Sequence, residues 1–95
     1  MLEKELEKKL VQATKNMGGL ALKFTSPGFS GMPDRLLLLQ GGNIAFVEVK
    51  APGEKPRSQQ VKRHKDLKRL GFKVYVLDEP KQIDLILKDL GGDAK

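Results

Sequence analysis

The sequence predicts an α/β domain in which a central mixed β-sheet is flanked by helices. Helical stripes of apolar residues open and close the chain, and two apolar runs joined by Gly41 and Gly42 indicate an antiparallel hairpin. A further strand follows an intervening helix, which is the pattern of a parallel crossover. Because a hairpin and a crossover cannot both be parallel, the sheet must be mixed. We expect a single domain over residues 1–95, with the element order α-β-β-β-α-β-α.

The first helix is predicted from apolar residues that recur every three or four positions. Its stripe consists of Leu2, Leu6, Leu10, Ala13 and Met17. Gly18 and Gly19 then end the helix. Residues 20–25 alternate between apolar and polar side chains, as a short strand does, and residues 26–33 are rich in Gly, Ser and Pro and predict a loop.

The hairpin is formed by residues 36–39 and 44–49, and its connection decides which side chains share a face. Strand alternation places Glu48 and Lys50 together on one face. A two-residue turn would place Asp34 opposite Val49. Asp34 joins the face of Glu48 and Lys50 only if the connection has three residues or contains a bulge, and two glycines suit either arrangement.

The second half of the chain predicts a helix, a strand and a final helix. Proline and glycine at positions 52, 53 and 56 precede a helix over residues 58–70, which Gly71 ends. Residues 72–77 predict a strand, and Pro80 suits the first turn of the last helix. The buried stripe of that helix is expected to be Ile83, Ile86, Leu87 and Leu90.

The formal net charge of +6 is concentrated in one segment. Residues 51–73 carry +6, whereas residues 1–50 carry +2 and residues 74–95 carry −2. Aromatic residues make up only 5% of the chain, so contact with phosphates is a better candidate for binding than base stacking. The absence of cysteine excludes a disulfide framework and a thiolate zinc site. No apolar run is long enough to cross a bilayer, so we expect no membrane contact.

Two carboxylates and an amine converge where the hairpin strands meet their loops. Asp34 precedes one strand, and Glu48 and Lys50 end the other. Paired carboxylates are ligands suited to Mg²⁺ or Mn²⁺, and a nearby ammonium can orient a water or stabilise charge on a phosphate. The alternative is an ordinary surface salt bridge, which is the commoner meaning of a short E-x-K pattern.

Several segments in order resemble a known family. These are G-M-P-D-R-L-L-L-L, then F-V-E-V-K-A-P-G, then a glutamine in a basic helix that ends L-G-F-K-V-Y-V. They resemble the VRR-NUC family of the PD-(D/E)xK nuclease superfamily, in its compact stand-alone form from phages and bacteria. The resemblance implies a cytoplasmic, Mg²⁺- or Mn²⁺-dependent DNA endonuclease. It further implies a homodimer that acts on branched DNA such as four-way (Holliday) junctions.

The resemblance also implies roles for single residues. Asp34, Glu48 and the backbone carbonyl of Val49 would be metal ligands, and Lys50 would be the catalytic lysine. Gln60 occupies the place of the family's helix glutamine. The family's carboxylate on the first helix corresponds to Glu7, which we favour, or to Glu3 one turn earlier.

DNA contacts are expected from basic and hydroxyl side chains around this site. The expected contact residues are Lys23, Ser26, Ser30, Arg35, Lys55, Arg57, Lys62 and Arg63. His64, in the same basic helix, is expected to face solvent or a phosphate. Two alternatives stay open, namely a non-catalytic nucleic-acid-binding module and a nuclease or nickase acting on flaps or single strands.

Overall fold

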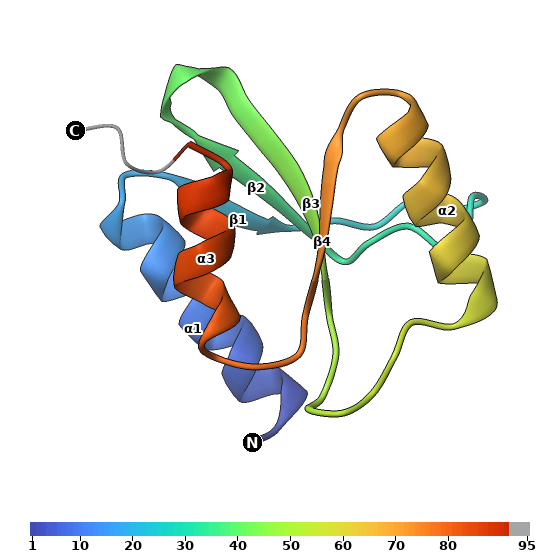
Figure 1. Cartoon of the computed structure of the whole chain (residues 1–95), viewed down its shortest axis with the longest axis horizontal. Helices are drawn as coiled ribbons and strands as arrows, with labels where there is room; N and C mark the ends of the chain where they lie inside the picture. The colour runs from blue at the N-terminus through green and yellow to red at the C-terminus, as the bar shows by residue number, and fades with distance from the viewer. Residues whose placement is uncertain (92–95) are drawn as a thin grey trace.

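A computed structural model describes residues 1–91, so the last four residues of the predicted domain, 92–95, lie outside the described part. It contains one four-stranded sheet with the strand order β1-β2-β3-β4 (Figure 1). The strands are β1 (Leu20–Lys23), β2 (Arg35–Leu39), β3 (Asn43–Val49) and β4 (Lys73–Leu77). The first three are antiparallel neighbours, and β3 and β4 are parallel. The predicted mixed α/β fold and element order are confirmed.

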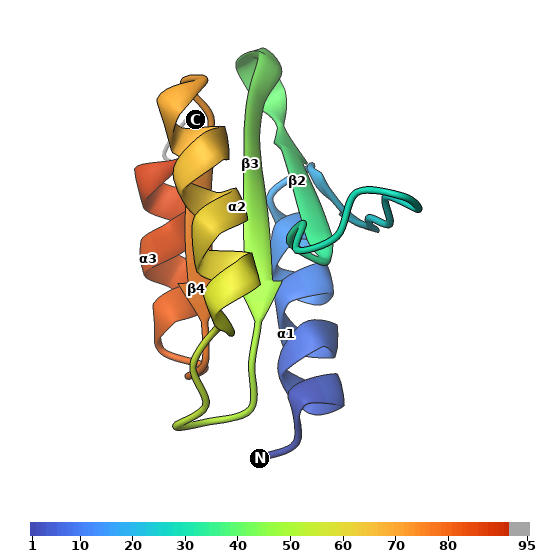
Figure 2. The ribbon, with the colours of Figure 1, turned by 90° about the vertical axis from the view of Figure 1, so that its right-hand side faces the viewer.

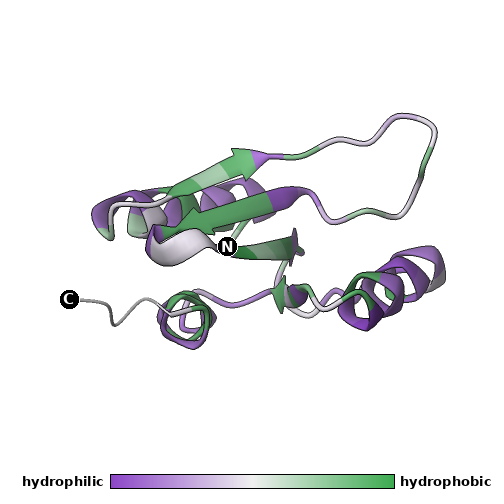
Figure 3. Ribbon diagram, turned by 90° about the horizontal axis from the view of Figure 1, so that it is seen from above, coloured by the Kyte–Doolittle hydropathy of each residue, from purple (hydrophilic) through white to green (hydrophobic). Residues whose placement is uncertain are grey.

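The helices cover the two faces of the sheet unequally. They are α1 (Glu3–Asn16), α2 (Ser58–Arg69) and α3 (Gln82–Asp89). α1 and α3 lie side by side on one face, and α2 lies on the other (Figures 1 and 2). Ala45, Val47 and Val49 point from β3 into the larger core, between the sheet and the α1–α3 layer. Figure 3 shows mainly hydrophobic strands next to helices in which hydrophilic residues alternate with hydrophobic ones.

The opposite face of the sheet carries a smaller aromatic cluster. The ring of Phe46 meets the rings of Phe24 and Phe72 edge-on, with centroids 5.7 and 5.8 Å apart. Edge-to-face contact is a favourable arrangement of aromatic quadrupoles. Glu48 follows Phe46 on this same face, so an apolar strand surface leads directly to an acidic residue.

The hairpin connection has three residues, which is one of the two alternatives that bring Asp34 to the face of Glu48. Leu39 pairs with Asn43 and Arg35 pairs with Val47, which leaves Gln40–Gly42 between the strands. Gly41 and Gly42 both have positive φ, at +81° and +76°, a conformation that glycine adopts without a steric penalty. One step beyond the Arg35–Val47 pair, this register sets Asp34 opposite Glu48.

Two local expectations differ from the structure. Leu2 is 69% exposed because it precedes α1 instead of lying within its buried stripe. Pro80 lies before α3, not in its first turn. The helix begins at Gln82, whose side-chain oxygen accepts hydrogen bonds from the backbone N–H groups of Asp78 and Glu79 in the preceding turn. Across residues 1–91, no helix is both long and apolar enough to span a membrane.

Candidate active site

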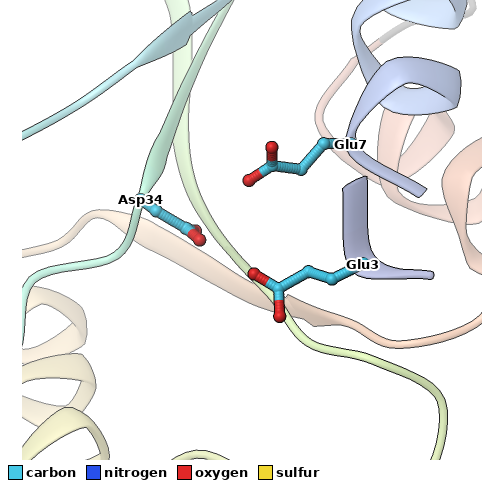
Figure 4. Close-up of side chains that lie close together, drawn as sticks. All are labelled: Glu3, Glu7 and Asp34. Carbon is cyan, nitrogen blue, oxygen red and sulfur yellow. The ribbon is translucent and has the colours of Figure 1, made fainter. Parts of the chain in front are cut away.

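Three carboxylates meet where the N-terminal end of α1 approaches the start of β2 (Figure 4). One oxygen each from Glu3, Glu7 and Asp34 lies within 4.8 Å of the other two. Glu3 and Glu7 are one helical turn apart and so project from the same side of α1. Leu6 and Leu10, buried in the core, fix that side of the helix against the sheet. The favoured Glu7 and the alternative Glu3 therefore both reach Asp34.

Asp34 is oriented by the neighbouring strand. The backbone N–H of Val49 donates a hydrogen bond to Asp34 Oδ1 at 3.1 Å. Burial raises the pKa of Asp34, and the charge of Glu7 adds to that rise, whereas the Val49 hydrogen bond opposes it. The pKa of Glu3 is raised by burial and by the charges of Asp34 and Glu7. Ionising these carboxylates together is unfavourable, and a bound cation would relieve that repulsion.

Glu48 lies beside this cluster and is buried, with only 3% of its surface exposed. Gln60 Nε2 donates to Glu48 Oε2 at 3.1 Å, and His64 Nε2 lies 3.4 Å from Glu48 Oε1. Lys50 Nζ is 4.0 Å from Glu48 Oε2. Burial, followed by the negative charge of Asp34, raises the pKa of Glu48 from 4.5 to about 7.

Gln60 is held so that its amide nitrogen faces Glu48. Its oxygen accepts a hydrogen bond from the backbone N–H of Arg57 at 2.8 Å, which leaves the NH₂ group for Glu48. Gln60 is thus a neighbour of the Glu48 carboxylate, and its catalytic role stays a prediction.

The prediction that His64 faces solvent or a phosphate is wrong. His64 is 6% exposed and faces Glu48, because it lies one turn after Gln60 on the side of α2 that covers the sheet. Burial lowers the pKa of His64, and the positive charges of Lys68 and Lys50 lower it further. The spacing of Gln60, His64 and Leu67 was the available signal, since these three form the buried stripe of α2.

Two of the expected DNA-contacting arginines make contacts inside the protein. Arg35 Nη2 lies 3.5 Å from Glu7 Oε1, and its Nη1 lies 3.4 Å from the carbonyl of Ala21. Arg63 Nε donates to the carbonyl of Ser30 at 3.0 Å, and its Nη1 pairs with Asp66 Oδ2 at 2.8 Å. Both side chains are mostly enclosed, so their role in DNA contact stays a prediction.

Arg63 also anchors the loop between β1 and β2. Its guanidinium lies 3.9 Å from the ring centre of Phe29, and Gln59 Nε2 donates to Ser30 Oγ at 2.6 Å. A Cβ added at Gly31 would lie 2.8 Å from the carbonyl oxygen of Gln59, so the backbone approaches α2 closely there. Ser30 is therefore engaged with α2. Ser26 is half-buried in the same loop, and its carbonyl accepts from the N–H of Phe29.

The remaining expected contact residues are exposed basic side chains. They lie at the end of β1 and around the start of α2. These residues are Lys23, Lys55, Arg57 and Lys62. Lys23 lines a pocket together with Glu7, and the charge of Arg57 acts on Glu48.

The residues present fit a divalent cation. Glu3, Glu7 and Asp34 offer clustered carboxylate oxygens, the donor type that Mg²⁺ and Mn²⁺ prefer. Glu48 does not belong to this group of three, because its oxygens are directed toward Gln60, His64 and Lys50. Of the ligand set expected from sequence, the structure brings Asp34 and Glu7 together and holds Glu48 next to them. The ligand role of the Val49 carbonyl stays a prediction.

Fold and site together define a small α/β domain with a carboxylate cluster and a lysine at the end of a hairpin. The chain belongs to the VRR-NUC family, because the model of the VRR-NUC domain matches residues 2–79. It is 53% identical over 76 residues to the protein named "Putative nuclease p44" of Acyrthosiphon pisum secondary endosymbiont phage 1. The aligned residues cover 80% of this chain and 82% of that protein. A solved structure of a VRR_NUC domain superimposes with a TM-score of 0.85 at 34% identity and covers 90% of this chain and 94% of that chain.

Proposed function

We propose that the protein is a divalent-metal-dependent nuclease that hydrolyses phosphodiester bonds in DNA. The observation that carries the proposal is the cluster of Glu3, Glu7 and Asp34 within 4.8 Å, next to the buried Glu48 and to Lys50. Membership of the VRR-NUC family and the name of the phage relative support the same activity. Exposed basic residues at the end of β1 and around the start of α2 suit a phosphate backbone.

The chain's own residues have separate tasks in this reaction. The Val49 N–H holds Asp34, and Gln60 together with His64 holds Glu48. Glu3, Glu7 and Asp34 would hold a divalent cation, which would supply Lewis acidity and make a nearby water more acidic. Lys50 carries a positive charge 4.0 Å from Glu48, where it can stabilise negative charge that develops on a phosphate oxygen.

The preferred substrate is branched DNA, such as a four-way junction. A domain of 95 residues with few aromatic side chains offers little surface for reading bases, so recognition through phosphates and DNA shape is favoured. Cutting two strands of a junction calls for two sites, which a homodimer presents about a two-fold axis. The alternative is a nuclease specific for flaps or single strands. Mapping the cleavage products on each substrate distinguishes this alternative from a junction-specific nuclease.

The test compares wild type with Asp34→Ala and Lys50→Ala on labelled junction, fork, flap and duplex DNA in Mg²⁺ and in Mn²⁺. We expect each variant to lose about 10²- to 10³-fold in cleavage rate while it still binds DNA. Lys88→Ala, an exposed lysine on α3, is the matched control and should cut normally. Wild type that binds DNA but cuts none of the substrates in either metal would favour the non-catalytic binding module instead.

Binding itself should be strongly salt-dependent. Neutralising about five phosphates per subunit predicts a slope of about −4 to −5 in a plot of log affinity against log salt concentration. A slope near zero would remove the basic segment from the interface.

A further inference from the structure

A groove of about 470 Å³ runs between α1 and the edge of the sheet, on the side of the carboxylate cluster away from α2. Helix α1 contributes Lys4, Lys8 and Val11 to its wall. These positions repeat at four and three residues and therefore line one side of the helix. Lys23 and Arg35 close the opposite wall, and they are paired residues of β1 and β2.

The groove is cationic. Three lysines and one arginine line it, against the single carboxylate of Glu7. The lysine side chains are exposed, so their charges are available to a ligand. Arg35 has unused hydrogen-bonding capacity, because its two contacts are long, at 3.4 and 3.5 Å. Among residues 1–91, Arg35 Nε is the only buried side-chain nitrogen or oxygen that has no hydrogen-bond partner.

Glu7 connects this groove to the carboxylate cluster. Its carboxylate lies near Asp34 and Glu3 and also pairs with Arg35 at 3.5 Å. A strand whose phosphate is held in the groove would thus continue directly past the carboxylates. Arg63 in α2 is already occupied by Ser30 and Asp66, so α2 has fewer free cations than the sequence suggested.

We propose that the groove between α1 and the β1–β2 edge binds a backbone phosphate of the nucleic-acid strand on which the carboxylate cluster acts. The proposal rests on the proposed function for the identity of the strand, but the binding it describes does not require cleavage. Lysine ammonium groups and an arginine fork are the side chains that bind phosphate in proteins. Every residue that lines the groove except Val11 carries a charged or polar group, so a phosphate that enters it meets several cationic side chains.

The test is DNA binding by a groove variant, Lys4→Gln/Lys8→Gln/Lys23→Gln, against a control of equal net charge, Lys9→Gln/Lys81→Gln/Lys88→Gln. All six lysines are exposed, so both variants should fold, which circular dichroism checks. The probe is a labelled four-way junction, with a linear duplex of equal length for comparison. Anisotropy is measured with EDTA, so that no strand is cut, between about 50 and 200 mM salt.

We expect the groove variant to bind about tenfold more weakly than the control at low salt, with a salt slope smaller in magnitude by about 1. Equal affinities and slopes for the two variants would overturn the proposal. The cleavage assay separates its failure from that of the proposed function. Wild type that never cuts, together with weakened binding by the groove variant, refutes the nuclease and supports the phosphate groove. Wild type that cuts, together with equal binding by both variants, refutes the groove alone.

Discussion

Replacing Glu48 with glutamine should stabilise the metal-free protein at neutral and alkaline pH. Burial and the charge of Asp34 raise the pKa of Glu48 from 4.5 to about 7 in the folded protein, so the native state binds this proton more tightly than the unfolded chain does. One pKa unit corresponds to about 1.4 kcal/mol, so ionising Glu48 costs the native state about 3 kcal/mol. The glutamine of the variant does not ionise and avoids this cost.

The sign follows from proton binding. Between about pH 4.5 and 7 the native state holds more protons than the unfolded state, so the free energy of unfolding of wild type falls as pH rises. The stabilising effect of a protonated Glu48 is complete below about pH 4.5 and is lost above about pH 7. The free energy of unfolding of Glu48→Gln minus that of wild type should therefore grow by about 3 kcal/mol from pH 4.5 to 8.

Urea unfolding of both proteins in EDTA, over this pH range, measures the difference. Glu54→Gln, at an exposed position in the loop after β3, is the matched control and should follow wild type at every pH. His64 contributes in the opposite direction below about pH 6.5 because its pKa is lowered. A difference that stays constant within about 0.5 kcal/mol from pH 4.5 to 8 would refute the reasoning.

Two further substitutions test one contact beside the site and one close approach within the fold. Arg63→Ala removes the hydrogen bond to the Ser30 carbonyl and the aromatic contact of the same loop, so stability should fall by about 1–3 kcal/mol and limited proteolysis of residues 24–34 should accelerate. The neighbouring exposed Lys62→Ala is the control, and equal proteolysis of the two variants would contradict the anchoring role. Gly19→Ala would place a Cβ 2.5 Å from the Leu38 carbonyl oxygen, so the melting temperature should fall by at least about 4 °C in a thermal scan. An unchanged melting temperature would contradict that close approach.

The fold could be predicted because its main signals are local. Apolar spacing, the glycine pair and the glycine at the end of the basic helix each specify an element through short-range geometry. The hairpin register follows from short-range geometry too, because alternation along β3 ties the position of Asp34 to the length of one connection. Only a three-residue connection or a bulge places Asp34 on the face of Glu48. Choosing between three residues and a bulge required the backbone itself.

The site was less predictable because its side chains respond to contacts between distant elements. The basic composition of α2 favoured an exposed His64, whereas the contact of His64 with Glu48, 16 residues earlier in the chain, forms only when the helix packs on the sheet. Arg63 illustrates the same limit, since its partner Ser30 lies 33 positions earlier. Glu3 and Glu7 were indistinguishable by helical spacing, and the tertiary position of α1 brings both near Asp34.

The three-residue connection at Gln40–Gly42 imposes a parity rule on the evolution of this hairpin. Adding or removing one residue there would shift the pairing by one step and turn the end of one strand toward the opposite face of the sheet. Changes of two residues, or a compensating bulge, would restore the alternation. Descendants of this sequence should therefore vary the far end of the hairpin in even steps or compensate with a bulge, even though that end lies at the opposite end of the strands from Asp34 and Glu48.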